Sequence, residues 1–266
     1  MLPVDFMDTA LQAAWEAGDT LLSRQGRPRE LQVKGVRDLV TDADFAAQRV
    51  IVEIIQRTYP GQRILAEEGA GQLDLSGDGP LWLIDPLDGT TNYIRGFPAF
   101  SVSIGLMQSG KPVLGVIHDP VASRTFIGER GMGANLLTQV AGGEMQEIRA
   151  SQMVGLDEAI IGLDWPRANP IRAEAVNLLI KVAPRCRSIR SHGSAALSLA
   201  YVAAGWMDGY CHFSIQAWDA AAGVAIVEAA GGRSARPDGV AWRPGDTSLI
   251  AGSTGVVEKL LELIDR

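Results

Sequence analysis

The stretch LWLIDPLDGTTNY, residues 81–93, is an apolar run that ends in two aspartates three positions apart, Asp85 and Asp88. A short apolar run that leads into proline and glycine predicts a buried strand followed by a turn. A second run just upstream, RILAEEG, has the same form and ends in Glu67 and Glu68. The sequence therefore predicts two strands whose ends carry carboxylates.

Carboxylates at strand ends either cap turns and face solvent or share a site, and taken singly each fits the first description. If the strand ends bring Glu67, Asp85 and Asp88 together, their charges repel one another unless a cation lies among them. Oxygen donors without Cys or His favour Mg²⁺, with Mn²⁺ as the alternative. Asp44, which opens a predicted helix, and Asp219, which opens an Ala-rich helix, extend the candidate set.

A phosphate-binding feature follows the second aspartate. Gly89 lets the backbone approach a ligand, and a helix that begins at Thr90 and Thr91 would hold a phosphate on its free N–H groups. Pro86 fixes the backbone so that the carbonyl of Leu87 can also turn toward a metal. Metals beside an anion site predict metal-assisted phosphoryl transfer.

The first half of the chain predicts helices flanking a run of strands. Thr41 or Asp42 can cap a helix whose apolar face includes Phe45, and a hairpin turns near Ser109 and Gly110. The second half alternates short strands with helices and ends in an amphipathic helix.

This change in the order of strands and helices predicts one continuous fold, residues 1–266, made of two closely packed parts. We expect an α+β half over residues 1–145 and an α/β half over residues 146–266, with a surface loop at residues 139–152 near the join.

Composition excludes several classes of protein. The formal net charge is −7, and no Lys/Arg cluster could neutralise a run of phosphates, which argues against direct nucleic-acid binding. Cys186 and Cys211 are too few for a disulfide framework, and neither lies in a zinc-binding pattern. The N-terminus lacks a basic region ahead of an apolar core, and no apolar run approaches the ~20 residues that span a bilayer. We therefore expect a cytoplasmic protein without a membrane partner.

Four motifs in this order resemble the inositol monophosphatase family: LVTDAD (39–44), ILAEEG (64–69), DPLDGTTNY (85–93) and WDAAAG (218–223). The stretch RSHGSAALSLAYVAAGWMDGY, before the last motif, is also similar to that family, and the resemblance runs from about Asp8 to the C-terminus. It implies a layered αβαβα sandwich of the inositol monophosphatase and fructose-1,6-bisphosphatase type. It also implies Mg²⁺-dependent hydrolysis of a small phosphorylated polyol or sugar, sensitivity to Li⁺, and a homodimer.

The resemblance implies two or three Mg²⁺ per site. The ligands would be Glu67, Glu68, Asp85, the Leu87 carbonyl, Asp88 and Asp219. The first metal would use Glu67, Asp85 and Leu87, and the second Asp85, Asp88 and Asp219. Glu67, and also Glu68, would help with a weaker third.

Catalytic roles are implied for three residues. Glu67 and Thr90 would orient the attacking water, and Asp44 would support Thr90 as the base. The residues implied at the substrate and its phosphate are Asp88, Gly89, Thr90, Thr91, Gly193, Ser194, His212 and Asp219.

Substrate choice departs from the family pattern at one position. Inositol-specific members carry a glutamate seven residues before the signature aspartate, where this chain has His212. His212 could donate to a hydroxyl or to a second phosphate, or be structural. Lys34 near the metal waters, His192 near the sugar and Arg167 near a substrate phosphate are further candidates, each with a solvated or structural alternative.

An inositol 1-phosphate-like substrate is expected. The alternatives are fructose 1,6-bisphosphate, histidinol phosphate and 3′-phosphoadenosine 5′-phosphate. A function of another class also stays open, because some bacterial relatives are regulatory partners of the transcription machinery. The intact set of carboxylates favours the enzyme, since a binding module has no need to hold them together against their repulsion.

Overall fold

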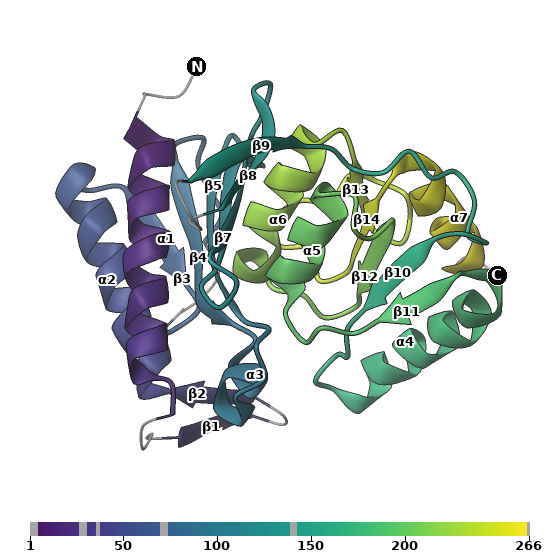
Figure 1. Ribbon diagram of the computed structural model, residues 1–266, viewed down its shortest axis with the longest axis horizontal. Helices are drawn as coiled ribbons and strands as arrows, with labels where there is room; N and C mark the ends of the chain where they lie inside the picture. Colours follow the sequence, from purple (N-terminus) through teal and green to yellow (C-terminus); the bar gives the residue numbers. More distant parts are fainter. Residues whose placement is uncertain (1–4, 27–30, 36–37, 70–73, 139–142, 265–266) are drawn as a thin grey trace.

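The structure is a computed structural model and describes residues 5–26, 31–35, 38–69, 74–138 and 143–264. Helices and sheets alternate in five layers across the molecule (Figure 1). A helical layer, a large sheet, a central helical layer, a smaller sheet and a second outer helical layer follow one another. The layered αβαβα sandwich expected from the sequence is confirmed.

The large sheet has seven strands in chain order. They are β3 (Arg63–Ala66), β4 (Leu81–Asp88), β5 (Ser101–Gln108), β6 (Lys111–Asp119), β7 (Arg124–Glu129), β8 (Gly133–Thr138) and β9 (Glu144–Ile148). Only β3 and β4 are parallel, so the predicted carboxylates at their ends lie at the same edge of the sheet. Each later strand pairs antiparallel with the one before it.

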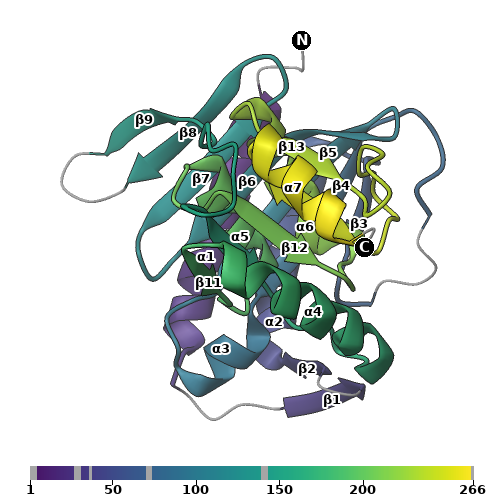
Figure 2. The ribbon, with the colours of Figure 1, turned by 90° about the vertical axis from the view of Figure 1, so that its right-hand side faces the viewer.

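The small sheet has the order β11-β10-β12-β14-β13. Its strands are β10 (Ile160–Leu163), β11 (Ser188–Arg190), β12 (Gly209–His212), β13 (Arg233–Ala235) and β14 (Leu249–Gly252). The first three are parallel, and β14 is antiparallel to both its neighbours. The hairpin of β1 (Leu31–Gly35) and β2 (Asp38–Thr41) forms a separate pair that lies near the short helix α3 (Figure 2).

The helices fill the remaining three layers. They are α1 (Asp5–Arg24), α2 (Asp42–Thr58), α3 (Thr90–Arg95), α4 (Asn169–Val182), α5 (Ala195–Ala203), α6 (Ala217–Ala229) and α7 (Thr254–Ile264), with a 3₁₀ turn at Ala183–Arg185. Helices α1 and α2 cover the large sheet, α5 and α6 lie between the sheets, and α4 and α7 cover the outer face of the small sheet (Figures 1 and 2). None of the described helices is both long and apolar enough to cross a membrane.

Helix α6 packs directly on the large sheet because that sheet has glycines beneath it. A Cβ at Gly115 would lie 2.1 Å from the carbonyl oxygen of Ala222, and one at Gly105 would lie 2.8 Å from the Ala222 nitrogen. Gly128 meets the backbone of Ile226 in the same way. The glycines and the Ala-rich helix together allow a close backbone approach, which fixes the height of α6 above the sheet.

Some sequence-based expectations are wrong in detail. The segment around residues 139–152 is not only a surface loop, because Glu144–Ile148 forms the edge strand β9; residues 139–142 lie outside the described part. Strand β8, strand β13 and the β1–β2 hairpin were not anticipated either. The alternation of these short segments is weak, and pairing with a neighbouring strand determines them instead.

The second helix, α2, begins at the expected cap, but one residue of its predicted apolar face is exposed. Thr41 is the N-cap, and its side chain and that of Asp44 form a reciprocal capping box. Ile51 and Ile55 are fully buried against the large sheet. The prediction that Phe45 belongs to this apolar face is wrong, since its side chain is 45% exposed.

A buried histidine gives the fold a testable pH dependence. His118 Nδ1 lies 3.0 Å from Thr125 Oγ1, which accepts a hydrogen bond from Trp15 Nε1 at 2.9 Å. Burial lowers the pKa of His118 to about 4. Because the unfolded chain binds this proton more readily, the stabilisation from the neutral ring is present above the ordinary pKa and is lost as pH falls from about 6.5 toward 4.

We therefore expect wild type to lose about 2 kcal/mol of unfolding free energy between pH 7 and pH 5 relative to His118→Gln, which cannot titrate. Urea denaturation followed by tryptophan fluorescence measures both proteins at the two pH values. Identical pH dependence in the two proteins would contradict the assignment of a neutral, buried His118.

Candidate active site

Most of the predicted residues gather around one cavity of about 440 Å³, which is lined by residues from both sheets. Glu67 follows β3, Asp85 and Asp88 end β4, and Asp219 lies in the first turn of α6. The other predicted residues that line it are Leu87, Gly89, Thr90, Thr91, Arg167, Gly193 and His212. Carboxylates from three separate elements therefore line one cavity.

A bulge in β4 explains how two aspartates three positions apart reach the same cavity. Side chains at odd separations along a regular strand point to opposite faces of the sheet. In β4, Asp85 pairs with Ser103 and Asp88 with Ser101, so three steps along β4 match two along β5. The extra residue turns Asp88 toward the side of Asp85. Pro86 lies within the bulge, where a residue without a backbone N–H is tolerated because it is not paired in the ladder.

The charges at this cavity interact strongly. Burial is the main cause that raises the pKa of Asp85 well above its usual range, and the charges of Glu67, Asp88 and Asp219 raise it further. The pKa of Asp219 is raised well above its ordinary value by burial first and then by Glu67 and Asp88. Burial raises the pKa of Asp88 to about 6. The site thus concentrates negative charge that a cation would stabilise.

Asp88 is held by the start of helix α5. Its carboxylate accepts hydrogen bonds from Ser194 Oγ at 2.5 Å, from the Ala196 nitrogen at 2.7 Å and from the Ala195 nitrogen at 3.3 Å. Ser194 is the N-cap of this helix and is buried. A carboxylate at a helix N-terminus is stabilised by the free N–H groups there, which offsets part of the cost of burial.

Thr90 connects the predicted base to the strand end. Its hydroxyl lies 3.1 Å from the carbonyl oxygen of Leu87 and 3.4 Å from Asp44 Oδ1. The other Asp44 oxygen accepts from the backbone and the hydroxyl of Thr41. Burial raises the pKa of Asp44 to about 6, with the charge of Glu67 as a smaller cause.

Several predicted residues lie behind the cavity wall or outside the description. Glu68 is buried, does not line the cavity, and exchanges two backbone hydrogen bonds with the side chain of Gln48. His192 packs edge-on against Tyr201 and is set back from the cavity. Lys34 belongs to β1, and its side chain lies outside the described part of the structure.

Sequence reasoning missed Asp164, a buried acid that also lines the cavity. Its Oδ1 accepts from Ser191 Oγ and from the Gly193 nitrogen, both at 2.9 Å, and its Oδ2 accepts from Tyr210 OH at 3.0 Å. Asp164 thereby holds the segment that leads to Ser194. The signal was available, because this acid directly follows the apolar run AIIGL, residues 159–163, just as Asp85 follows the apolar run LWLI.

Asn92 was also missed. Its side-chain amide donates to the carbonyl oxygens of Ala99 and His192, both at 2.7 Å, and so joins α3 to the segment before α5. This contact ties the two halves of the cavity together.

The donor set fits Mg²⁺ better than a softer metal. The cavity is lined by Leu87 and by five carboxylates, those of Glu67, Asp85, Asp88, Asp164 and Asp219. Carboxylate and carbonyl oxygens are the donors that Mg²⁺ prefers. Within the described residues, no three Asp, Glu, His or Cys side chains are gathered closely enough to form a ready-made metal site. Holding a cation therefore requires these side chains to draw toward one another.

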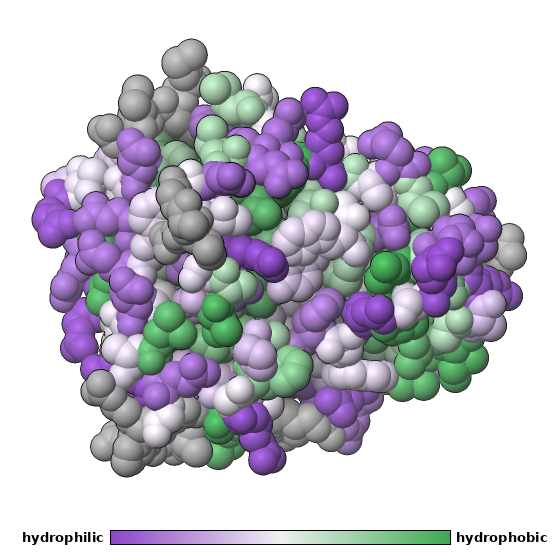
Figure 3. All heavy atoms as spheres, viewed as in Figure 1, coloured by the Kyte–Doolittle hydropathy of each residue, from purple (hydrophilic) through white to green (hydrophobic). Residues whose placement is uncertain are grey.

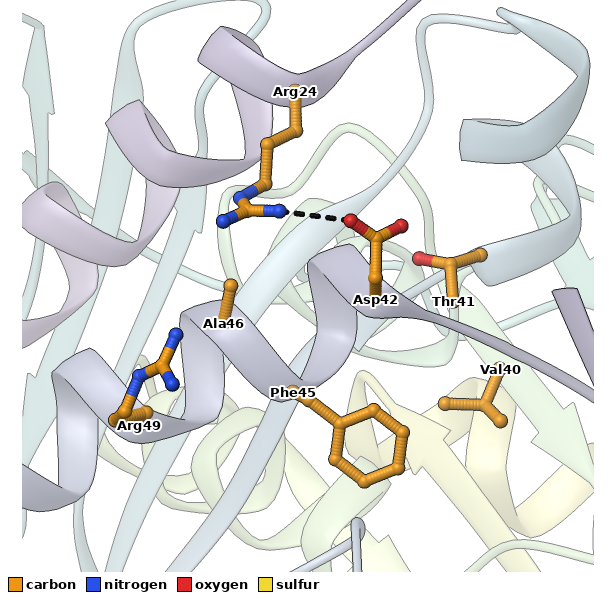
Figure 4. A pocket seen from close by; sticks show the side chains of 7 residues that line it. All are labelled: Arg24, Val40, Thr41, Asp42, Phe45, Ala46 and Arg49. Atoms are coloured by element: carbon orange, nitrogen blue, oxygen red, sulfur yellow. Dashed lines mark hydrogen bonds and ion pairs between the residues drawn. The ribbon is translucent and has the colours of Figure 1, made fainter. Parts of the chain in front are cut away.

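A second, smaller cavity of about 280 Å³ lies between the end of α1 and the start of α2 (Figure 4). Arg24 Nη1 pairs there with Asp42 Oδ2 at 2.8 Å, while Arg49 and Phe45 extend from α2. Its single carboxylate is already neutralised by Arg24. This cavity lacks the clustered acids that distinguish the first one.

Comparison with known proteins identifies the family. Residues 3–265 match the inositol monophosphatase family. The chain is 35% identical to the Nus factor SuhB of Escherichia coli (strain K12), covering 96% of this chain and 94% of that protein. It is 35% identical to an inositol-1-monophosphatase of Mesorhizobium japonicum, covering 98% of this chain and 96% of that protein.

Solved structures agree with the sequence relatives. The extragenic suppressor protein suhB of Bartonella henselae superposes with a TM-score of 0.89 at 33% identity, over 98% of both chains. An inositol monophosphatase (IMPase) of Thermotoga maritima superposes with a TM-score of 0.86 at 32% identity, over 98% of this chain and 97% of the other. Sequence, fold and cavity agree, and this chain belongs to the inositol monophosphatase family.

Proposed function

We propose that the protein is a Mg²⁺-dependent phosphatase that hydrolyses a small phosphate monoester of the polyol or sugar phosphate class. One observation carries this proposal. Glu67, Asp85, Asp88 and Asp219 line a single cavity, where burial and then the charges of Glu67 and Asp88 raise the pKa of Asp85 and that of Asp219. Stability alone does not favour such a buried like-charged cluster, whereas a cation that in turn binds a phosphate requires it.

Each acid has a role in holding the metals. Glu67, Asp85 and the Leu87 carbonyl would bind one Mg²⁺, and Asp85, Asp88 and Asp219 a second. A third, weaker ion would lie beside Glu67. Glu68 would help with this ion only indirectly and not as a ligand, because its side chain does not line the cavity. When bound, Mg²⁺ acts as a Lewis acid that favours ionisation of water and neutralises charge on the phosphate.

The remaining steps belong to the protein. Glu67 and the Thr90 hydroxyl would orient the attacking water, and Asp44, 3.4 Å from that hydroxyl, would accept the proton. Backbone N–H groups of Gly89, Thr90 and Thr91 would hold the phosphate in line with the water. Gly193 and Ser194 would position the alcohol portion through the α5 N-terminus.

Phosphate release from four esters tests the proposal: myo-inositol 1-phosphate, fructose 1,6-bisphosphate, histidinol phosphate and 3′-phosphoadenosine 5′-phosphate. Each is assayed with Mg²⁺ and again with excess EDTA. We expect release from at least one ester that stops in EDTA and returns with added Mg²⁺. Release from none, or release that EDTA does not affect, would overturn the proposal.

A regulatory role in transcription is the second candidate. It is supported by the name Nus factor that similar proteins from Escherichia coli and Pasteurella multocida carry. Such a role requires a protein-binding surface and no chemistry at the cavity. A variant without phosphatase activity that still performed the regulatory function would separate the two.

The homodimer implied by the resemblance has one supporting surface. Val176 and Ile180 on α4 are 39% and 66% exposed. Figure 3 shows hydrophobic residues gathered over this helix. A second copy of the chain would cover such a patch more readily than water does.

A further inference from the structure

The wall of the cavity contributed by the small sheet differs in character from the acidic wall. The segment between β10 and α4 and the first turn of α4 place Trp165, Arg167 and Arg172 at the same cavity as the carboxylates. Two guanidinium groups and an aromatic ring thus lie next to the site where a phosphate ester would be cleaved. Neither arginine has a role in the metal binding or the phosphate hydrolysis proposed above, so those steps do not explain the positive charge on this wall.

Arg172 is fixed in place by its own neighbours. Its Nε donates to the carbonyl oxygen of Pro166 at 2.7 Å, and its Cζ lies 6.0 Å from the centre of the Trp165 ring. The terminal nitrogens are not used in either contact, and no ion pair joins Arg172 to an acid in the described ranges. A guanidinium held through Nε and stacked on an aromatic ring is pre-organised to bind an anion through its free end.

Arg167 lines the same cavity as Asp219 and His212. A guanidinium is always charged in proteins, so Arg167 adds a permanent positive charge to this wall. The two arginines therefore extend the positive charge from the edge of the carboxylate cluster to the rim at Trp165.

His212 gives the same wall a neutral side chain where the family pattern has a negatively charged glutamate. At the position where inositol-specific relatives carry a glutamate, the His212 ring accepts a hydrogen bond from the Ser214 nitrogen at Nδ1, 3.0 Å away. Its proton is consequently on Nε2, and the ring is a donor. A glutamate here would accept from sugar hydroxyls and repel an anion, whereas a histidine donates and does not repel one.

We propose that the preferred substrate is a phosphate monoester with a second anionic group, and that Arg167 and Arg172 bind this second group. The inference rests on the proposed phosphatase function and specifies its substrate class. Either a second phosphate or a carboxylate has the chemistry that a pair of guanidinium groups recognises. A cavity of about 440 Å³ has room for a phosphorylated sugar of this kind.

Fructose 1,6-bisphosphate and fructose 1-phosphate form a matched pair for the test, since both present the same phosphate at C1 and differ only at C6. Steady-state kinetics with Mg²⁺ give kcat and KM for each. We expect kcat/KM to be at least about tenfold higher for the bisphosphate, mainly through a lower KM, as for one charge-assisted hydrogen bond. In the double variant Arg167→Gln/Arg172→Gln this ratio should fall toward one.

Two further variants separate binding from a structural effect. Arg172→Lys keeps the charge and should retain part of the preference, while Arg185→Gln removes an exposed arginine near the end of α4 and should leave the ratio unchanged. Equal kcat/KM for both esters in wild type would overturn this inference and leave the phosphatase proposal intact. An equal loss on both esters in the double variant would show that the arginines are structural. No release from either ester or from the four-ester panel would overturn the phosphatase proposal itself.

Discussion

Asp88→Asn is expected to lower kcat at least about a thousandfold, because losing ~4 kcal/mol of transition-state stabilisation corresponds to three factors of ten. Asn has the size of Asp, and its one oxygen can take the place of Oδ2, which accepts from Ser194 Oγ and the Ala196 nitrogen; only the longer bond from the Ala195 nitrogen to Oδ1 is lost. Asn lacks the charge that a metal requires. Burial raises the pKa of Asp88 to about 6, so the charged form is costly in the folded protein and its removal should not lower the melting temperature. Phosphate release and calorimetric melting on the same preparation measure the two effects.

Asp119→Asn is the matched control. Asp119 is also buried and also accepts two backbone hydrogen bonds, from Val121 at 3.1 Å and from Ala122 at 3.0 Å, but it does not line the cavity. We expect this variant to keep wild-type activity. If Asp88→Asn retained activity, or if both variants lost it equally, the carboxylates would not be acting as a specific site.

Gly115→Ala is expected to destabilise the protein by about 3 kcal/mol, at the upper end of the cost of overpacking a core. The new methyl group would lie 2.1 Å from the Ala222 carbonyl oxygen, which is backbone and cannot rotate away. Helix α6 must therefore move off the large sheet. Because Asp219 lies in the first turn of that helix, activity should fall as well. Urea denaturation gives the free energy of unfolding.

Gly79→Ala provides the comparison. A Cβ at Gly79 would meet no atom within 4 Å, so this variant should be as stable as wild type. A Gly115→Ala protein of wild-type stability would mean that α6 does not lie against the backbone of β6 as described.

The sequence was sufficient to single out Glu67, Asp85 and Asp219 because strand ends and helix starts are local features, although the same signal at Asp164 was missed. Asp85 and Glu67 follow apolar runs, and parallel pairing of β3 with β4 places them at one edge. The Thr41 cap is equally local, since its partner Asp44 is three residues away. Motifs that depend on neighbours in the chain are therefore predictable from the chain.

Features set by distant contacts were not predictable in the same way. The bulge that turns Asp88 toward Asp85 depends on register with β5, and no residue in β4 encodes that register by itself. Phe45 has the helical spacing of the apolar face, yet its side chain is exposed and lines the smaller cavity together with Arg24 from α1. Glu68 adjoins Glu67 in sequence, yet only Glu67 lines the cavity, and the backbone of Glu68 pairs with the side chain of Gln48 on α2.

Strand β9 shows the same limit. Four of its five residues, Glu144 to Glu147, are exposed, so it lacks the buried face that produces a clear alternating pattern. It becomes a strand because β8 offers an open edge with which it pairs from Ala134 to Thr138.

Calorimetric titration of Mn²⁺ into protein freed of metal tests most directly whether these carboxylates form a divalent-metal site. We expect wild type and Asp119→Asn to bind at least two ions per chain, and Asp88→Asn to lose at least one of them. Binding of no Mn²⁺ by wild type, or identical titrations for wild type and Asp88→Asn, would contradict a metal site at this cavity.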